Sequence, residues 1–313
     1  MKLLTFSVTS GRPRLGVLIG DNKVLDVALA YHIVLGSPPP RILASMKELI
    51  AGGERGLKLV SYVLEASLEE LGSGSKLSKL LEDRAIHSIE SIRFHPPIPN
   101  PEKMLFVAVN YWSHAKELNL EPPETPYFFV KLPNTLVAHR DPVIIPRGSL
   151  KPDHEVELAV VIGREGKYVS RGKALDHVFG YTIANDVSLR DRQQPIPRYG
   201  IRWVHAKSFD TGAPLGPWIV TRDEVEDPHN LRLELRVNGE VRQEGSTSDM
   251  IFKIPELIEA ASDGLTLKPG DVISTGTPSG VGAATGRFLR HGDVMMAVVE
   301  RIGALTNPVV FES

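Results

Sequence analysis

From residue 104 onwards, apolar residues come mainly in short runs of the length and composition of β-strands. Examples are MLFVAV, PYFFVKL, NTLVAHR, EVELAVVIG, GYTIAN and VMMAVVE, and such runs predict buried or half-buried strands. The regular strand–helix alternation and the glycine-rich turn of a dinucleotide-binding sheet are missing. One clear helix, PELIEAASDG, has a spacing that places Leu257, Ile258 and Ala261 on one side. The sequence therefore predicts an α+β fold that is mostly β.

The first part of the chain has a different pattern. LLTFSV, RLGVLIG and KVLDVAL predict a β-meander. Residues 41–70 have helical spacing that is broken at Gly52 and Gly53, and a further short helix follows LGSGSK. SIRFHPPIPNPEKM then contains four prolines, which favour an extended linker. We therefore expect an N-terminal accessory domain over residues 1–97 and a larger, strand-rich domain over 98–313.

Composition narrows the class of protein. The 313 residues suffice for one large domain or two modest ones, and a formal charge of −2 gives no electrostatic reason to expect nucleic acid or an anionic membrane as partner. The chain has no cysteine, which excludes disulfides, a cysteine nucleophile and thiolate metal sites. No apolar stretch is long enough for a membrane helix, and the N-terminus lacks a signal-peptide pattern. We expect a soluble, cytoplasmic protein.

Two carboxylates stand at the start of an apolar run in DHEVELAVVIG. On a strand Glu155 and Glu157 point the same way, and one of them should stay protonated unless a cation intervenes. Asp186 follows another apolar run. Separately, these residues fit a solvated strand end and a turn or helix cap. Together they predict an oxygen-only site that suits Mg²⁺ or Mn²⁺ and leaves coordination positions open, as a catalytic metal requires.

A second set of polar residues could act on a substrate. His114 and Glu117 in NYWSHAKE are neighbours on a short helix expected to start near Asn110, where the carboxylate would raise the basicity of the imidazole. The pair could instead be an incidental contact on an exposed helix. Lys207 and Lys131 could pair with a substrate carboxylate or enolate, or lie on the surface with their stems over apolar neighbours.

The segment STGTPSGVG is rich in glycine and threonine. Closely spaced glycines let backbone N–H groups approach an anion, although no Gly-Lys-Ser/Thr follows as in a P-loop. An ordinary tight turn between strands is the alternative.

Seven segments, in this order and spacing, resemble the fumarylacetoacetate hydrolase family over about residues 100–310. They are NYWSHAKE, PYFFVKLPNTL, DHEVELAVVIGR, GYTIANDVSLRDRQ, KSFDTGAPLGPWIVT, VNGEVRQEGSTSDMIF and LKPGDVISTGTPSGVG. The resemblance implies a mixed β-sandwich roll that usually forms a homodimer. The N-terminal residues resemble the small accessory domain of many microbial members.

The resemblance also implies a set of site residues. A bound Mg²⁺ or Mn²⁺ is implied at three positions: Glu155, Glu157 and Asp186. An acid/base dyad on a lid is implied at His114 and Glu117, with Lys207 near the substrate. In acylpyruvase-like members, further residues contact or approach the substrate. The matching positions in this sequence are Arg190, Gln193, Thr277 and Lys131.

One departure from the family pattern bears on the substrate. Fumarylacetoacetases carry an additional aspartate where Asn110 falls, which points to the branch that acts on smaller substrates. The resemblance then implies a divalent-metal-dependent hydrolase that cleaves a C–C bond in small acylpyruvate or 2-oxo diacid substrates through a metal-stabilised enolate. Alternatives are a 2-hydroxyhepta-2,4-diene-1,7-dioate isomerase acting on 2-hydroxy-dienoic acids and an oxaloacetate-type decarboxylase. A further alternative is a 2-keto-3-deoxy sugar acid dehydratase, although such members of the family tend to have a shorter gap between the paired glutamates and the third carboxylate than this sequence has.

A reading from a different class also stays open. A non-catalytic β protein could use the same carboxylates to hold a structural Ca²⁺. Such a site would have no use for His114 and Glu117, so the dyad distinguishes the two readings.

Overall fold

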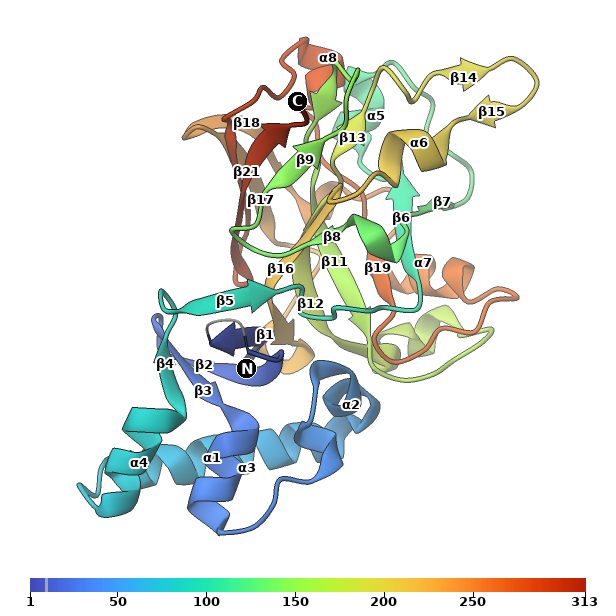
Figure 1. Cartoon of the computed structure of the whole chain (residues 1–313). Helices are drawn as coiled ribbons and strands as arrows, with labels where there is room; N and C mark the ends of the chain where they lie inside the picture. Colours follow the sequence, from blue (N-terminus) through green and yellow to red (C-terminus); the bar gives the residue numbers. More distant parts are fainter. Residues whose placement is uncertain (9–10) are drawn as a thin grey trace.

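The computed structural model describes residues 1–8 and 11–313. Its first 95 residues form a small antiparallel sheet with helices beside it, which gather at the lower end of the molecule in Figure 1. The elements of this part are β1 (Lys2–Val8), β2 (Arg14–Ile19), β3 (Lys23–Asp26), α1 (Val27–Leu35), the 3-10 turn η1 (Arg41–Leu43), α2 (Met46–Ala51), α3 (Gly53–Leu71), α4 (Lys76–Arg84), β4 (Ile86–Ser88) and β5 (Ile92–His95).

Most sequence predictions for this part are confirmed. β1, β2 and β3 form the expected meander, and the helical stretch breaks at Gly52, where α2 gives way to α3. The interpretation of KVLDVAL as one strand is wrong. The strand stops at Asp26, whose Oδ1 accepts a hydrogen bond from the Leu29 amide at 3.0 Å and so caps α1. Because the apolar run continues through the cap, its pattern alone does not show where the strand ends.

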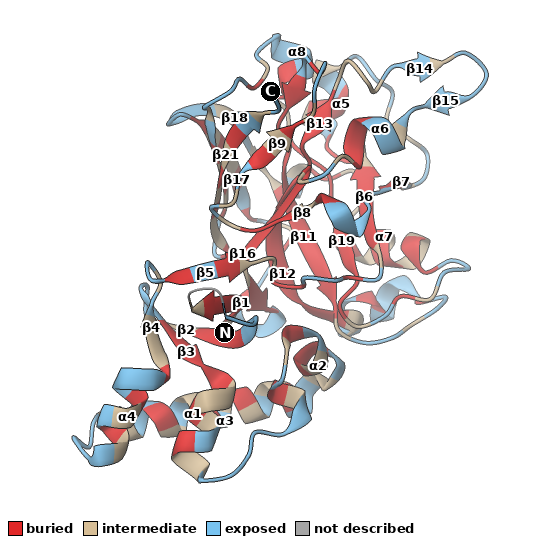
Figure 2. Cartoon of the chain, in the orientation of Figure 1, coloured by how far each residue is buried: buried red, intermediate tan, exposed pale blue. Residues whose placement is uncertain are grey.

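These N-terminal strands belong to one large sheet that continues through the molecule in the order β4-β3-β2-β1-β16-β12-β11-β19-β6-β7. Its remaining strands are β6 (Met104–Ala108), β7 (Tyr127–Val130), β11 (Val156–Ile162), β12 (Val178–Asn185), β16 (Ala213–Thr221) and β19 (Val272–Ser274), with the short β8 (Leu136–Val137) beside β16. Figure 2 shows buried residues along β11, β12 and β16 in the middle of this sheet. These strands form the core on which the candidate site is built.

Apart from Glu157, strand β11 is apolar because it is buried on both faces. Leu158 and Val160 pack in the core shared with the second sheet, whereas Ala159 and Val161 pack in the core shared with the N-terminal part. A strand covered on both sides shows no polar alternation, which explains the continuous run in the sequence.

A second sheet packs against the first and completes a sandwich. Its order is β18-β17-β20-β21-β9, from strands β9 (Val143–Ile145), β17 (Arg232–Val237), β18 (Glu240–Ser246), β20 (Val294–Val299) and β21 (Gly303–Phe311). Asn238 and Gly239, with φ of 53° and 83°, make the tight turn between β17 and β18. Two further pairs are β10 (Pro152–Asp153) with β13 (Ser188–Leu189) and β14 (Pro195–Ile196) with β15 (Gly200–Ile201). The predicted α+β, mostly β sandwich roll is confirmed.

Helices in this part are more numerous than predicted. They are α5 (Trp112–Glu117), α6 (Trp203–Lys207), α7 (Ile254–Ala261) and α8 (Gly282–Thr285), with the 3-10 turns η2 (Pro133–Thr135), η3 (Arg171–His177), η4 (Arg222–Glu224) and η5 (Thr247–Asp249). The predicted helix α7 buries Leu257, Ile258 and Ala261 as expected. NTLVAHR is mostly not a strand, because Pro133 starts η2 and only two residues pair as β8. Among the described residues, no helix is long and apolar enough to cross a membrane.

The N-terminal strand joins the two parts of the molecule. Lys2 and Leu3 of β1 pair with Val220 and Ile219 of β16, so the small sheet continues into the large one. Further along the same edge, Thr5–Val8 of β1 pair with β5, which shows that the first residues of the predicted linker form a strand. The division of the chain at residue 97 stays a prediction.

The pairing of β1 with β16 leads to a prediction about stability. Leu3 is fully buried in the same core cluster as Ile219 and Leu215. Leu3→Ala should lower the free energy of unfolding by about 2–5 kcal/mol and lower the midpoint of a single thermal transition. The control Leu68→Ala, at a half-exposed position on α3, should change it by about 0.5 kcal/mol or less. Two separate transitions in Leu3→Ala, with the second at the wild-type midpoint, would contradict this coupling.

Candidate active site

Three buried carboxylates converge where β11 begins and β12 ends. The two strands are antiparallel, with Val156 opposite Asn185, so Glu155 and Glu157 meet Asp186 at one end of this strand pair. One oxygen of each carboxylate lies within 4.8 Å of the others, and the three residues are at most 5% exposed. These residues are therefore not a solvated strand end, and their charges must be compensated inside the protein.

Three cations provide this compensation. Lys207 Nζ donates to Glu155 Oε2 at 2.8 Å and to Asp186 Oδ2 at 2.6 Å. Lys131 donates to the other oxygen of Asp186, and Arg190 donates to Glu155 Oε1. Both lysines are almost completely buried, so neither is a surface residue whose stem covers apolar neighbours.

The carboxylates differ in their protonation behaviour. Burial alone would raise the pKa of Glu155, but the positive charges of Arg190 and Lys207 hold that pKa well below its usual range. Burial and the negative charges of Asp186 and Glu155 raise the pKa of Glu157 well above its usual range. The residues thus behave as expected of a carboxylate pair in which one member stays protonated unless a further cation is present.

The donor set fits a divalent metal ion. Glu155, Glu157 and Asp186 offer only oxygen atoms, which Mg²⁺ and Mn²⁺ prefer as ligands. The protonated state favoured at Glu157 is the one that a divalent cation would reverse. These observations support the predicted ligand set without fixing the identity of the metal.

The predicted dyad lies on the short helix α5. His114 Nδ1 is 2.7 Å from Glu117 Oε1, and the second oxygen of Glu117 accepts a hydrogen bond from the Gly280 amide at 2.8 Å. The first turn of α5 is held by Asp249, whose carboxylate accepts from the Ser113 amide at 2.9 Å. Both residues of the dyad are largely buried, so this is not an incidental contact on an exposed helix. With Nδ1 bound to Glu117, Nε2 of His114 is the nitrogen available to a substrate.

A small cavity of about 130 Å³ lies beside the carboxylates and the dyad. The polar residues in its wall are His114, Glu155, Glu157, Arg190, Gln193, Lys207 and Thr277. The apolar residues are Val107, Ala108, Val109, Leu118, Leu120, Phe129, Ile201 and Trp203. Sequence reasoning assigned no role to this apolar half, although the aromatic run PYFFV was a signal for Phe129. Trp203, which stacks on Phe129 with ring centroids 4.7 Å apart, lies on the unpredicted helix α6.

Of the four residues expected to contact or approach the substrate, three lie in the cavity wall. Arg190 and Gln193 lie side by side in the wall, with Arg190 Nη1 donating to Gln193 Oε1 at 2.8 Å. The Thr277 hydroxyl donates to the Val156 carbonyl at 2.9 Å, so its proton is already used within the protein. Among the described residues that line the wall, Lys131 is missing. Its amino group donates a hydrogen bond to Asp186 instead. The roles of these four residues stay predictions.

Two buried amides near the site have structural roles. The Asn110 side chain donates to the Thr275 carbonyl at 2.8 Å and accepts from the Phe252 amide at 2.8 Å. Gln243 reaches in from the second sheet and donates to Thr277 Oγ1 at 2.8 Å. Its position was not predicted, because nothing local in VRQEG indicates a contact with a segment 34 residues further along the chain.

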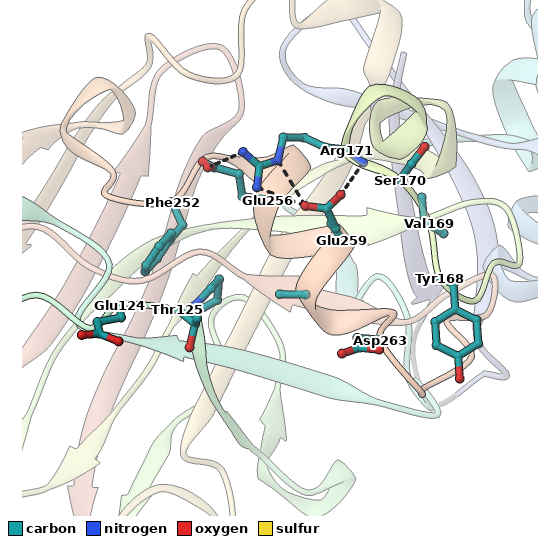
Figure 3. A pocket seen from close by; sticks show the side chains of 12 residues that line it. Glu124, Thr125, Tyr168, Val169, Ser170, Arg171, Phe252, Glu256, Glu259 and Asp263 are labelled. Atoms are coloured by element: carbon teal, nitrogen blue, oxygen red, sulfur yellow. Dashed lines mark hydrogen bonds and ion pairs between the residues drawn. The ribbon is translucent and has the colours of Figure 1, made fainter.

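A larger cavity of about 820 Å³ lies elsewhere, between α7, η3 and residues 124–126. Figure 3 shows Arg171 held there by Glu256 and Glu259. None of the predicted site residues lines this cavity, so it does not compete with the carboxylate site as the candidate active site.

Comparisons with known proteins decide the family. Residues 103–310 match the family model described as fumarylacetoacetate (FAA) hydrolase C-terminal. The chain belongs to the fumarylacetoacetate hydrolase family. It is 39% identical to oxaloacetate tautomerase fahd2, mitochondrial, of Xenopus laevis, over 99% of this chain and 90% of that protein. It is 40% identical to oxaloacetate tautomerase YisK of Bacillus subtilis, over 94% of this chain and 95% of that protein.

A solved structure extends the likeness to the whole fold. The crystal structure of maleylpyruvate hydrolase from Sphingobium sp. SYK-6, in complex with a manganese(II) ion and pyruvate, is 31% identical with a TM-score of 0.73. The match covers 100% of both chains. Because these family members are enzymes with named activities, this chain is an enzyme of the same family.

The charge arrangement yields a prediction for Lys207. Replacing it with methionine removes one buried partner of Glu155 and Asp186, and breaking a buried ion pair in this way costs about 3–5 kcal/mol of stability. In EDTA, Lys207→Met should therefore unfold at a much lower temperature than the wild type. Added Mg²⁺ or Mn²⁺ should restore part of the loss, because a cation that binds only the folded state stabilises it.

Lys103→Met is the matched control. Lys103 pairs with the buried Asp271 at 3.0 Å but is itself partly exposed and lies outside the cavity wall. The stability lost in Lys103→Met should be smaller than in Lys207→Met and should not respond to divalent cations. Equal losses in both variants, with no response to metal, would contradict the proposed balance of charges.

Proposed function

We propose that this enzyme interconverts the enol and keto forms of a small 2-oxo diacid of the oxaloacetate kind. It would use Mg²⁺ or Mn²⁺ held by Glu155, Glu157 and Asp186. The observation that carries the proposal is that His114, paired with Glu117, lines one small cavity together with the buried Glu155 and Glu157. Relatives named oxaloacetate tautomerases align with nearly the whole chain. They favour a proton-transfer reaction over C–C hydrolysis, which was the first expectation from the sequence.

The dyad can carry the proton that this reaction moves. When an enol becomes a ketone, the C2 hydroxyl loses a proton and C3 gains one, so atoms and charge balance without a further reactant. His114 accepts the proton on Nε2, and the Glu117 carboxylate at Nδ1 stabilises the imidazolium that results. The imidazolium then donates its proton to C3.

The cavity suits a small dianionic substrate. Arg190 and Lys207 bring positive charge to its wall. This positive charge attracts the carboxylates of the substrate and stabilises the negative charge of the transient enolate. When bound, a divalent cation supplies Lewis-acid stabilisation of negative charge on a substrate oxygen. A volume of about 130 Å³ is well below the 300–1,000 Å³ or so of pockets for drug-sized ligands, which favours a substrate of few heavy atoms.

Hydrolysis of a C–C bond is the second candidate. The specific observation in its favour is the full-length match to maleylpyruvate hydrolase. In that reaction His114 would take a proton from water, which adds to a carbonyl carbon before the neighbouring C–C bond breaks. Leu118, Leu120 and Phe129 give the wall an apolar side, which limits the room for an ordered water and favours proton transfer.

These proposals predict the effect of changes in the dyad. His114→Ala should lower kcat for enol–keto conversion of oxaloacetate by about 10²–10⁴-fold, the usual contribution of a general acid–base group. Glu117→Gln should have a smaller effect, because it weakens the orientation of the ring without removing it. The loss of enol absorbance measures the rate, and His32→Ala, at an exposed histidine far from the cavity, should match the wild type.

Metal removal and substrate choice complete the test. Treatment with EDTA should abolish turnover, and Mg²⁺ or Mn²⁺ should restore it. A panel of oxaloacetate, maleylpyruvate and a short acylpyruvate should give tautomerisation without release of pyruvate. Release of pyruvate from maleylpyruvate or the acylpyruvate as the fastest reaction would establish the hydrolase instead, and release of pyruvate with CO₂ from oxaloacetate would indicate a decarboxylase. Full activity in metal-free protein would overturn both candidates.

A further inference from the structure

Asp153 is a fully buried carboxylate next to the candidate site but outside the wall of its cavity. Its Oδ1 accepts hydrogen bonds from the amides of His154 at 2.8 Å and Gly282 at 2.6 Å. Its Oδ2 accepts from the Ala283 amide at 2.8 Å and from Arg190 Nε at 2.8 Å. Four donors from three separate segments thus meet on one side chain.

Arg190 is the partner through which Asp153 reaches the site. Each of the three guanidinium nitrogens of Arg190 binds a different group, with Asp153 at Nε, Gln193 at Nη1 and Glu155 at Nη2. A planar guanidinium whose Nε is fixed has one remaining orientation in which Nη2 meets Glu155. Asp153 therefore determines where the guanidinium stands in the cavity wall.

The other contacts of Asp153 fix the loop that holds the dyad. Its bonds to the amides of Gly282 and Ala283 anchor one end of residues 280–283. At the other end of this segment the Gly280 amide donates to Glu117, which orients His114. Asp153 thus lies between the dyad and Glu155, and it contacts both through one intermediate.

We infer that Asp153 is a positioning residue for substrate binding. It holds the Arg190 guanidinium in the orientation that binds a carboxylate of the substrate. Through residues 280–283 it also fixes the position of the dyad relative to that carboxylate. This inference rests on the proposed function only in assuming that the cavity binds a small 2-oxo acid. A carboxylate is required, because an asparagine would present an NH₂ group to N–H donors and leave at least one of them without an acceptor.

The competing explanation is that Asp153 only stabilises the chain between β10 and α8. A purely structural role would lower the melting temperature of a variant without changing the affinity of the folded protein for ligand. An effect transmitted through Arg190 would lower this affinity and would vanish when Arg190 is already absent.

A double-mutant cycle separates the two explanations. The variants are Asp153→Asn, Arg190→Ala and the double variant, with oxalate as the probe at saturating Mn²⁺ and isothermal titration calorimetry as the readout. We expect Asp153→Asn to weaken oxalate binding about ten-fold or more, as for the loss of a hydrogen bond to a charged group. In the Arg190→Ala background the same change should have almost no further effect.

Asp271→Asn is the matched control. Asp271 is also a buried carboxylate that accepts from backbone amides, those of Lys103 at 3.0 Å and Lys268 at 2.7 Å. It lies outside the cavity wall, so its replacement should lower the melting temperature and leave oxalate binding unchanged. Equal oxalate affinity in Asp153→Asn and Asp271→Asn would overturn the inference, as would an equal loss with and without Arg190. Binding of oxalate does not depend on turnover, so the outcome is independent of whether oxaloacetate is the substrate.

A glycine variant provides a test if Asp153→Asn does not fold. A Cβ added at Gly282 would stand 2.6 Å from Asp153 Oδ1 and 2.8 Å from the Arg287 carbonyl oxygen, so Gly282→Ala pushes residue 282 and the carboxylate apart without changing any charge. Oxalate affinity should fall in the same direction, whereas Gly172→Ala, which meets no atom within 4 Å, should match the wild type. Unchanged oxalate affinity in Gly282→Ala would overturn the inference.

Discussion

The rest of the structure depends on three carboxylates buried side by side. Glu155, Glu157 and Asp186 would repel one another and lose their hydration if the protein supplied no positive charge. It supplies Lys207, Arg190 and Lys131 within hydrogen-bond distance. A buried network of this kind costs stability unless nearly every charge has a partner, so the segments that carry the cations must reach their places for the core to close.

This requirement explains why the site lies at the ends of strands rather than along them. β11 and β12 are covered by apolar packing on both faces in their middle portions. At the first residues of β11 the packing gives way to the loops that carry Asp186 and Thr277 and to helix α6, which carries Lys207, and polar partners become available there. The same geometry leaves room for a cavity, so the charge balance of the core and the binding of an anionic substrate use the same residues.

Local sequence patterns predicted some features of the site and missed others. The spacing of Glu155 and Glu157 was enough to place them on one face, and the interval between His114 and Glu117 was enough to pair them on a helix. Nothing local indicated that Asp153 would contact Arg190 or that Gln243 would reach across from the second sheet, because those contacts depend on strand order. The short helix α6, which carries Lys207 and Trp203, lacks a cap or a clear periodicity. The homodimer and the cytoplasmic location stay predictions.

The pairing of distant segments has a consequence for how the chain acquires its activity. Asp153 and Gly282 are 129 residues apart, and the N-terminal amino group contacts Thr221 across 220 residues. Chains dominated by such non-local contacts fold slowly, because loop closure precedes any gain in packing. Partly folded forms of this protein would hold the acidic strand ends without their cations. Competence to bind substrate therefore emerges late, as a property of the finished molecule.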